Sequence, residues 1–158
     1  LSDFMALVAP TINSYTRLVP GLWAPTNNSW GIDNRTCSLR VIPGSPSSQR
    51  VEYRLGSADS NPYLSMAAAL ASGLWGIENK VEPGPPLHGN SYQNETNGLE
   101  DLPQTLQDSV TTLKESRPAR LYLGSDFVDH YSATREWEIA EYRKQVTDWQ
   151  MNRYFEII

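Results

Sequence analysis

Arginine dominates the charged residues between positions 11 and 55 of this sequence. The segment holds five arginines and no lysine against two acids, which gives it a net charge of +3 inside a chain of formal net charge -5. These arginines are Arg17, Arg35, Arg40, Arg50 and Arg54. A guanidinium group matches the oxygens of phosphate and carboxylate in a planar, bidentate geometry. The segment therefore predicts a site for a small anion, and the acidic remainder argues against nucleic acid as a general partner.

One glutamate accompanies the arginines in the stretch RVEYRL, residues 50–55. From Val51 on, every second residue is apolar and should face a core, so Arg50, Glu52 and Arg54 share the opposite face of a strand. The stretch TCSLRVI, residues 36–42, also alternates as a half-buried strand does. If the two strands pair, Arg40 joins the same charged face.

This charged face has two interpretations. It could be a solvated strand surface with cross-strand ion pairs, which is the commoner use of such residues. Alternatively, Glu52 binds a divalent cation while the arginines hold phosphate or carboxylate oxygens. The residues of the strand alone favour the first interpretation.

The elements that must position these side chains follow from local signals. Residues 18–42 hold two prolines, two glycines, Trp23 and Trp30, which predicts a stiff, turn-rich segment and not one regular element. Asn61 and Pro62 predict the start of a helix whose apolar, small-residue interior should be buried. Residues 81–103 are expected to form a long loop of functional or assembly use.

Two further helices are expected towards the end of the chain. A short one should lie within residues 101–116. From about residue 133 an amphipathic helix should carry Ile139, Tyr142, Val146 and Trp149 on one stripe.

Several classes of protein are disfavoured by the sequence. No apolar run reaches the roughly 18 residues needed to span a bilayer, and the first residues lack the basic region of a secretory signal. The single cysteine, Cys37, permits no internal disulfide and is expected to be a core residue. His88 and His130 lack metal-ligand spacing, and no Walker loop, GxGxxG or GxSxG motif is present. We expect a cytoplasmic protein with no membrane or nucleic-acid partner.

Taken together, the motifs resemble a known family. The stretches NSYTRLVPG, DNRTCSLRV, RVEYRLGSADSNPYLSMAAALASGLWGIENK and LEDLPQTL match, in order, the C-terminal half of the glutamine synthetase catalytic domain. The resemblance runs from about residue 10 to the final helix. It implies an α+β fold in which antiparallel strands form the active-site face and helices pack on the other side. Residues 1–158 would be the C-terminal portion of that domain, without its first half and the N-terminal domain.

The resemblance also implies roles for the charged residues. Arg17 would contact the glutamate substrate, Arg35 and Arg40 the phosphates of ATP and of γ-glutamyl phosphate, and Arg50 the nucleotide. Glu52 would be a ligand of the second divalent cation, Mg²⁺ or Mn²⁺, and Arg54 would bind glutamate and the transferred phosphate. Arg35 and Arg54 are then the catalytic residues, because they neutralise charge during phosphoryl transfer.

Three positions depart from the family pattern. Trp23, in PGLWAP, stands where the family has a glutamate that binds and deprotonates ammonium, and indole cannot do either. Ser47 takes the place of a common lysine, and Glu100 that of a tyrosine that some members adenylylate. Replacements like Trp23 resemble the branches that join glutamate to larger amines, where the indole could stack on an organic ammonium.

Three functions remain open at this point. The leading one is an ATP-dependent ligase that joins glutamate to ammonia or an organic amine, as a homo-oligomer of stacked rings. The isolated segment should be inactive. The alternatives are a non-catalytic assembly protein like the lens members of the family, and a regulatory relative that binds ligands without turnover.

Overall fold

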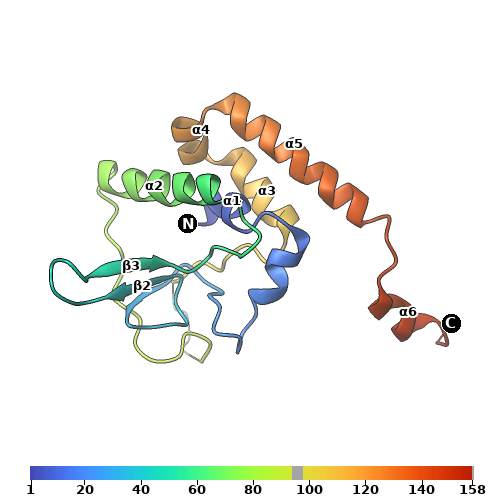
Figure 1. The fold of residues 1–158 in the computed structure, drawn as a ribbon, viewed down its shortest axis with the longest axis horizontal. Coiled ribbons are helices and arrows are strands. Elements are labelled where there is room, and N and C mark those ends of the chain that lie inside the picture. Colours follow the sequence, from blue (N-terminus) through green and yellow to red (C-terminus); the bar gives the residue numbers. More distant parts are fainter. Residues whose placement is uncertain (94–97, 158) are drawn as a thin grey trace.

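The computed structural model of the protein describes residues 1–93 and 98–157. Two short 3-10 helices, η1 (Ser2–Phe4) and η2 (Ile12–Arg17), flank α1 (Met5–Val8). A small sheet of β1 (Trp30–Ile32), β2 (Leu39–Ile42) and β3 (Arg50–Tyr53) follows, and then the helices. These are α2 (Pro62–Glu78), α3 (Leu106–Glu115), α4 (Arg117–Leu123), α5 (Ser125–Tyr142) and α6 (Asp148–Tyr154). The sheet lies on one side of α1 and α2, and α4 and α5 lie on the other (Figure 1). The predicted α+β class is confirmed.

The sheet has the strand order β1-β2-β3 and is mixed. β2 and β3 pair antiparallel as predicted, with Arg40 opposite Glu52 and Leu39 opposite Tyr53. β1 runs parallel to β2, with Trp30 opposite Leu39. This third strand was not predicted, because its three residues are too short a stretch to show alternation.

The core lies where the N-terminal helices meet α2, α3 and α5. α3 packs against η1, α1 and α5, and α1 also packs against α2. The largest fully buried aliphatic and aromatic side chains of this core are Phe4, Met5, Leu7, Val8, Leu55, Leu106, Val110, Leu113 and Val128. Cys37 is also fully buried, as predicted.

Side-chain caps fix where two of the predicted helices begin. The Asn61 carboxamide oxygen accepts from the amides of Tyr63 and Leu64 at the start of α2. The Thr105 hydroxyl accepts from the amide of Asp108 at the start of α3. Each cap pairs backbone N–H groups that have no partner within the helix itself.

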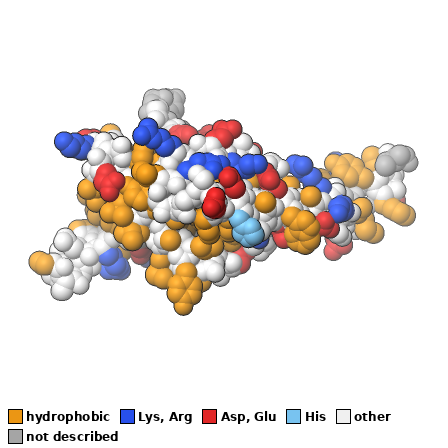
Figure 2. All heavy atoms as spheres, turned by 90° about the horizontal axis from the view of Figure 1, so that it is seen from above, with side chains coloured by type: hydrophobic (Ala, Val, Ile, Leu, Met, Phe, Trp, Pro, Cys, Tyr) orange, Lys and Arg blue, Asp and Glu red, His pale blue; other side chains and the backbone are white. Residues whose placement is uncertain are grey.

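The prediction that α2 is buried is wrong for this chain. Ala68 and Ala71 are its buried residues, whereas a stripe of large apolar side chains is exposed: Tyr63, Met66, Leu70, Leu74 and Ile77. Hydrophobic side chains gather on the side of the molecule where α2 lies (Figure 2, left). Val51 was likewise expected in a core and is 60% exposed, although Leu55 is fully buried. An apolar pattern shows that a face suits burial but not which polypeptide covers it.

The end of the chain forms two helices where one was predicted. α5 ends at Tyr142, and Thr147 begins α6 with a capping box that it forms with Gln150. Ile139 is buried, whereas Val146 and Trp149 are exposed, so the predicted stripe does not continue past α5. α6 stands away from the body of the molecule (Figure 1). Among the described residues, no helix combines the length and the apolar character that crossing a membrane requires.

Residues 81–103 form a loop as predicted, with residues 94–97 outside the described part of the chain. The loop returns to the sheet twice. The Leu87 amide donates to the Trp30 carbonyl (2.8 Å) and the Trp30 indole N–H donates to the Gly84 carbonyl (2.7 Å). The loop thus lies along β1.

Candidate active site

The paired strands β2 and β3 place three charged side chains in one cluster. Arg40 Nη1 lies 3.2 Å and 3.1 Å from the two carboxylate oxygens of Glu52. Arg54 Nη1 lies 3.4 Å from Glu52 Oε2. The contact between Arg40 and Glu52 arises because the two residues are direct cross-strand partners, and side chains opposite each other in antiparallel strands lie on the same face. Three residues of the predicted charged face, Arg40, Glu52 and Arg54, are therefore in contact.

Asp33 extends this cluster towards the turn after β1. Its carboxylate accepts hydrogen bonds from Arg40 Nε (3.0 Å) and from Arg40 Nη2. Asp33 has a left-handed backbone (φ 50°), which short polar residues adopt at lower cost than most others. Hydrogen bonds from Arg40 lower the pKa of both Asp33 and Glu52. Both carboxylates are therefore charged at neutral pH.

We expect the Arg40 ion pairs to stabilise the protein in a pH-dependent way. Folding lowers these two carboxyl pKa values, so the stabilisation is complete above the pKa of an unfolded carboxyl, about 4, and is lost as the pH falls through the lowered values. Urea unfolding between pH 2 and 7 should give a stability difference between wild type and Arg40→Gln that shrinks on acidification. The control is Arg117→Gln on α4, which removes an exposed arginine. A difference that does not change with pH would contradict the prediction.

Arg17 lies at the end of β3, next to Arg54. Its Nη2 lies 3.2 to 3.4 Å from the carbonyl oxygens of Arg54, Leu55 and Gly56. Burial, and after it the charge of Arg54, lower the pKa of Arg17. A cation that is partly desolvated beside a second cation favours an anion between or beside them. This is consistent with the predicted anion site.

Trp23 is connected to the charged face through its backbone. Arg54 Nη2 donates to the Trp23 carbonyl oxygen at 2.9 Å. Trp23 has φ 55°, a left-handed conformation that is uncommon for a bulky residue, and it is 65% exposed. The indole is therefore presented to the surface by a constrained turn whose carbonyl is held by an arginine of the sheet.

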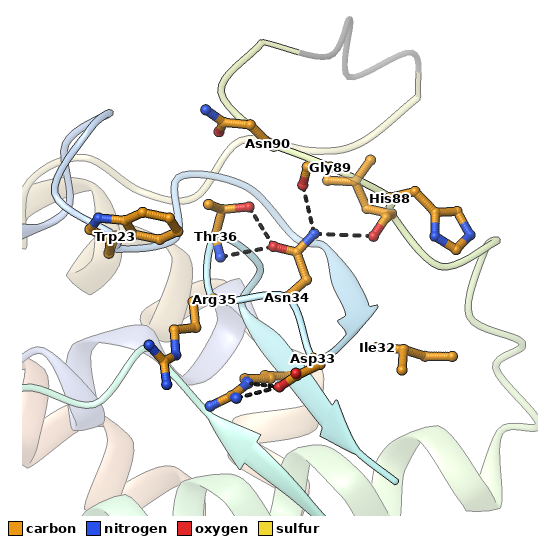
Figure 3. A pocket seen from close by; sticks show the side chains of 11 residues that line it. Trp23, Ile32, Asp33, Asn34, Arg35, Thr36, His88, Gly89 and Asn90 are labelled. Carbon is orange, nitrogen blue, oxygen red and sulfur yellow. Dashed lines mark hydrogen bonds and ion pairs between the residues drawn. The ribbon is translucent and has the colours of Figure 1, made fainter.

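A cavity of about 520 Å³ lies beside this turn. It is lined by Trp23, Ile32, Asp33, Asn34, Arg35, Thr36, Arg40, Leu87, His88, Gly89 and Asn90. Three of the predicted site residues, Trp23, Arg35 and Arg40, line it, and the turn at 33–36 meets the loop at 87–90 beside it (Figure 3). Arg17, Glu52 and Arg54 are not among the residues that line it. Glu52 contacts Arg40, and Arg54 contacts the Trp23 carbonyl. Arg17 contacts the Arg54 carbonyl.

Arg50 is separate from this cluster. It opens β3 next to the exposed hairpin that joins β2 to β3, and its Nη1 lies 3.3 Å from the Ser48 carbonyl. Asp33, Asn34, Thr36 and residues 87–90 also line the cavity and were not among the predicted site residues. The sequence predicted a loop of functional or assembly use over residues 81–103, but not that residues 87–90 lie against a turn more than 50 positions away.

The described residues do not by themselves fit a divalent cation. They contain no group of three or more His, Cys, Asp and Glu side chains that could surround one. Glu52 offers one carboxylate, and both of its oxygens accept hydrogen bonds from Arg40. A divalent cation needs several further oxygen ligands at about 2.0 to 2.6 Å. A cation held by Glu52 would therefore depend on ligands from outside these residues.

Comparison with known proteins adds three findings. The family model described as "Glutamine synthetase, catalytic domain" matches residues 1–154. "Type-1 glutamine synthetase 2" of Dictyostelium discoideum is 49% identical over 100% of this chain and 30% of its own length. "Glutamate--isopropylamine ligase" of Pseudomonas sp is 42% identical over 99% of this chain and 34% of its own length.

A solved structure, "GmaS/ADP complex-Conformation 1", has the same fold. It superimposes with a TM-score of 0.84 at 34% identity, covering 98% of this chain and 36% of its own. The chain thus spans about a third of the length of each of these relatives.

Proposed function

This chain belongs to the glutamine synthetase catalytic-domain family, and from this premise we propose that it carries the arginine face of an ATP-dependent ligase. The ligase joins the γ-carboxylate of glutamate to ammonia or an organic amine. Glutamate and ATP react first to give γ-glutamyl phosphate and ADP, and the amine then displaces phosphate. The observation that supports this most is the cluster of Arg40, Glu52 and Arg54 beside the cavity that Arg35 lines.

Each arginine has a role in this proposal that its position supports. Arg17 and Arg54 lie together at the end of β3 and would bind glutamate, with Arg54 also binding the transferred phosphate. Arg35 and Arg40 line the cavity and would bind the phosphates of ATP. Fixed guanidinium groups stabilise charge on phosphate oxygens in the transition state.

The proposed roles of Arg50 and Glu52 involve groups outside the cluster of Arg40, Glu52 and Arg54. Arg50, at the edge of the face, would contact the nucleotide. Glu52 would provide one ligand to Mg²⁺ or Mn²⁺, and the other ligands would come from outside the described residues. The metal would neutralise phosphate charge when bound.

The amine substrate is proposed to be organic because of Trp23. An exposed indole at the cavity can stack on an alkylammonium group but cannot remove a proton from ammonium. One relative named above is a glutamate–isopropylamine ligase, which supports this class of substrate. We therefore favour small alkylamines over ammonia.

Assembly is a second part of the proposal. We propose a cytoplasmic homo-oligomer of stacked rings in which α6 and the loop at 81–103 make contacts between subunits. Exposed apolar side chains on and after α6, including Trp149, Phe155 and Ile157, support α6 in this role.

The test is ATP-dependent phosphate release by the full-length protein. With ATP, Mg²⁺ and glutamate present, ammonia, isopropylamine, longer alkylamines and diamines are compared as acceptors. We expect at least one alkylamine to give a kcat/KM about 10-fold or more above that of ammonia, the scale of one cation–π contact with some apolar burial. Ammonia preference would overturn the choice of amine. No release with any acceptor, from folded and assembled protein, would overturn the ligase and favour a non-catalytic assembly protein.

A further inference from the structure

Two loops that are distant in sequence line the cavity and contact each other beside it. The turn at 33–36 follows β1 and carries Arg35, and the loop at 87–90 carries His88. The function proposed above gives Arg35 a phosphate to bind but does not explain what fixes its position.

The Asn34 side chain joins the two loops. Its Nδ2 donates to the Leu87 carbonyl at 3.1 Å and to the Gly89 carbonyl at 2.8 Å. Its Oδ1 accepts from Thr36 N at 3.0 Å and from Thr36 Oγ1 at 2.7 Å (Figure 3). An amide has two donors and two acceptor lone pairs, so the hydrogen-bonding capacity of Asn34 is fully used.

A second pair of hydrogen bonds closes the same junction. Ser91 N donates to Thr36 Oγ1 at 3.1 Å, and Ser91 Oγ donates to the Thr36 carbonyl at 3.0 Å. Thr36 and Ser91 are 3% and 2% exposed. Hydrogen bonds at buried positions are costly to break, because the separated groups lose their partners without regaining water.

The backbone of β1 at Gly31 also lies close to the loop at Leu87. A Cβ atom on Gly31 would lie 2.7 Å from the Leu87 carbonyl oxygen and 2.9 Å from Asn34 Cβ. β1 therefore contacts the loop where only glycine fits. The two loops are packed directly against each other.

Arg35 is the one residue of the turn whose side chain is left for a ligand. Asp33 is bound by Arg40, and Asn34 and Thr36 are bound as described. The Arg35 guanidinium is exposed, lines the cavity and makes no hydrogen bond or ion pair with the described residues. Its position is therefore set by the backbone of the turn and not by contacts of its own.

We infer that Asn34 is a positioning residue, which clamps the loop at 87–91 to the turn at 33–36 and thereby directs Arg35 at the phosphate of the bound nucleotide. This inference rests on the proposed function, which provides the phosphate. Asn34 touches no substrate itself and acts through Arg35.

The test is Asn34→Asp in the full-length protein. The substitution keeps the shape but replaces both donors by a carboxylate oxygen that faces two carbonyl oxygens. We expect kcat for phosphate release to fall about 10- to 100-fold, the range that follows from displacing a catalytic group by about 1 Å. The matched control is Asn61→Asp at the start of α2, where the amide acts as an acceptor and a carboxylate caps equally well. Its kcat should be unchanged.

A double-mutant cycle separates positioning from a general loss of structure. In an Arg35→Lys background, which keeps the positive charge but loses the forked geometry, Asn34→Asp should cost no more than about 3-fold, because its effect is transmitted through Arg35. An equal loss in both backgrounds would overturn the inference. The Arg35→Lys background keeps the positive charge at residue 35. A purely electrostatic effect of the new carboxylate at residue 34 would therefore be as large in this background as in the wild-type background.

Two additions keep the inference testable if the first variant fails. Ser91→Ala loosens the same junction without adding charge, and should lower kcat less but with the same dependence on Arg35. The cycle is also measured as ADP affinity by calorimetry. Wild-type protein that binds ADP but releases no phosphate would defeat the proposed turnover alone, whereas ADP affinity insensitive to both Asn34→Asp and Ser91→Ala would defeat the inference. Wild-type protein that does not bind ADP would defeat both.

Discussion

Arg54→Ala in the full-length protein is expected to lower glutamate-dependent phosphate release by about 10²- to 10³-fold, the effect of removing one preorganised donor from a developing anion. Arg54 connects the charged cluster of the sheet to the turn that carries Trp23. One Nη atom contacts Glu52 on the sheet and the other donates to the Trp23 carbonyl of the turn. Its Nε is buried and has no hydrogen-bond partner among the described residues.

Loss of Arg54 has a consequence for Trp23 as well as for phosphate. The Trp23 carbonyl loses its donor, and a left-handed tryptophan without that support should relax. Hydrogen exchange should therefore rise at residues 21–24 in Arg54→Ala. Arg54→Lys keeps the charge but cannot contact Glu52 and the Trp23 carbonyl at once through two Nη atoms. The activity of this variant should therefore lie between that of wild type and that of Arg54→Ala. Arg117→Ala, at an exposed arginine of α4, is the matched control. Wild-type turnover in Arg54→Ala would exclude Arg54 from the chemistry.

Trp23→Glu is expected to change the preferred acceptor from an alkylamine to ammonia. The substitution removes an apolar surface that binds an alkylammonium group, which is worth about 0.5 to 2 kcal/mol as a cation–π contact before area is counted. It also places a carboxylate where ammonium can bind and lose a proton. We expect the ratio of kcat/KM for the alkylamine to that for ammonia to fall about 100-fold, combining both effects.

Two control substitutions test whether this change is specific to Trp23. Trp137→Glu makes the same change at an exposed tryptophan of α5 and should leave the ratio unaltered. Trp23→Gly removes the indole and fits the positive φ without strain, so it should lose alkylamine preference without gaining ammonia activity. An unchanged ratio in Trp23→Glu would show that another part of the protein selects the amine.

The sequence was sufficient to predict the charged face, and the reason is geometric. Side-chain alternation in a strand has a fixed period of two, so Arg50, Glu52 and Arg54 had to share a face once the stretch was recognised as a strand. The residues left the pairing of this strand with the one that carries Arg40 conditional, and the antiparallel arrangement was implied by the family resemblance. The predicted cap at Asn61 is also local, because it is decided within three residues.

The features that were missed depend on distant or absent contacts. The wall formed by residues 87–90 has no periodicity, and its position becomes visible only through the bonds that Asn34 makes more than 50 residues away. α2 was predicted to be buried because its composition is apolar, but composition does not reveal that its stripe lacks a cover among the described residues. The break between α5 and α6 depends on a cap at Thr147 that competes with a continuous stripe.

The pairing of Arg40 with Glu52 also affects how the hairpin reaches its final alignment during folding. A slip of β3 by one residue would turn Glu52 to the other face and bring Val51 or Tyr53 opposite Arg40. Such a hairpin would lose the Arg40–Glu52 ion pair and leave Leu55 misplaced, so it would be unstable as well as inactive. Correct alignment and an assembled site therefore arise in the same step. A preparation with impaired folding should accordingly contain a smaller number of fully competent molecules, with unchanged KM, and not a uniform population of weakened ones.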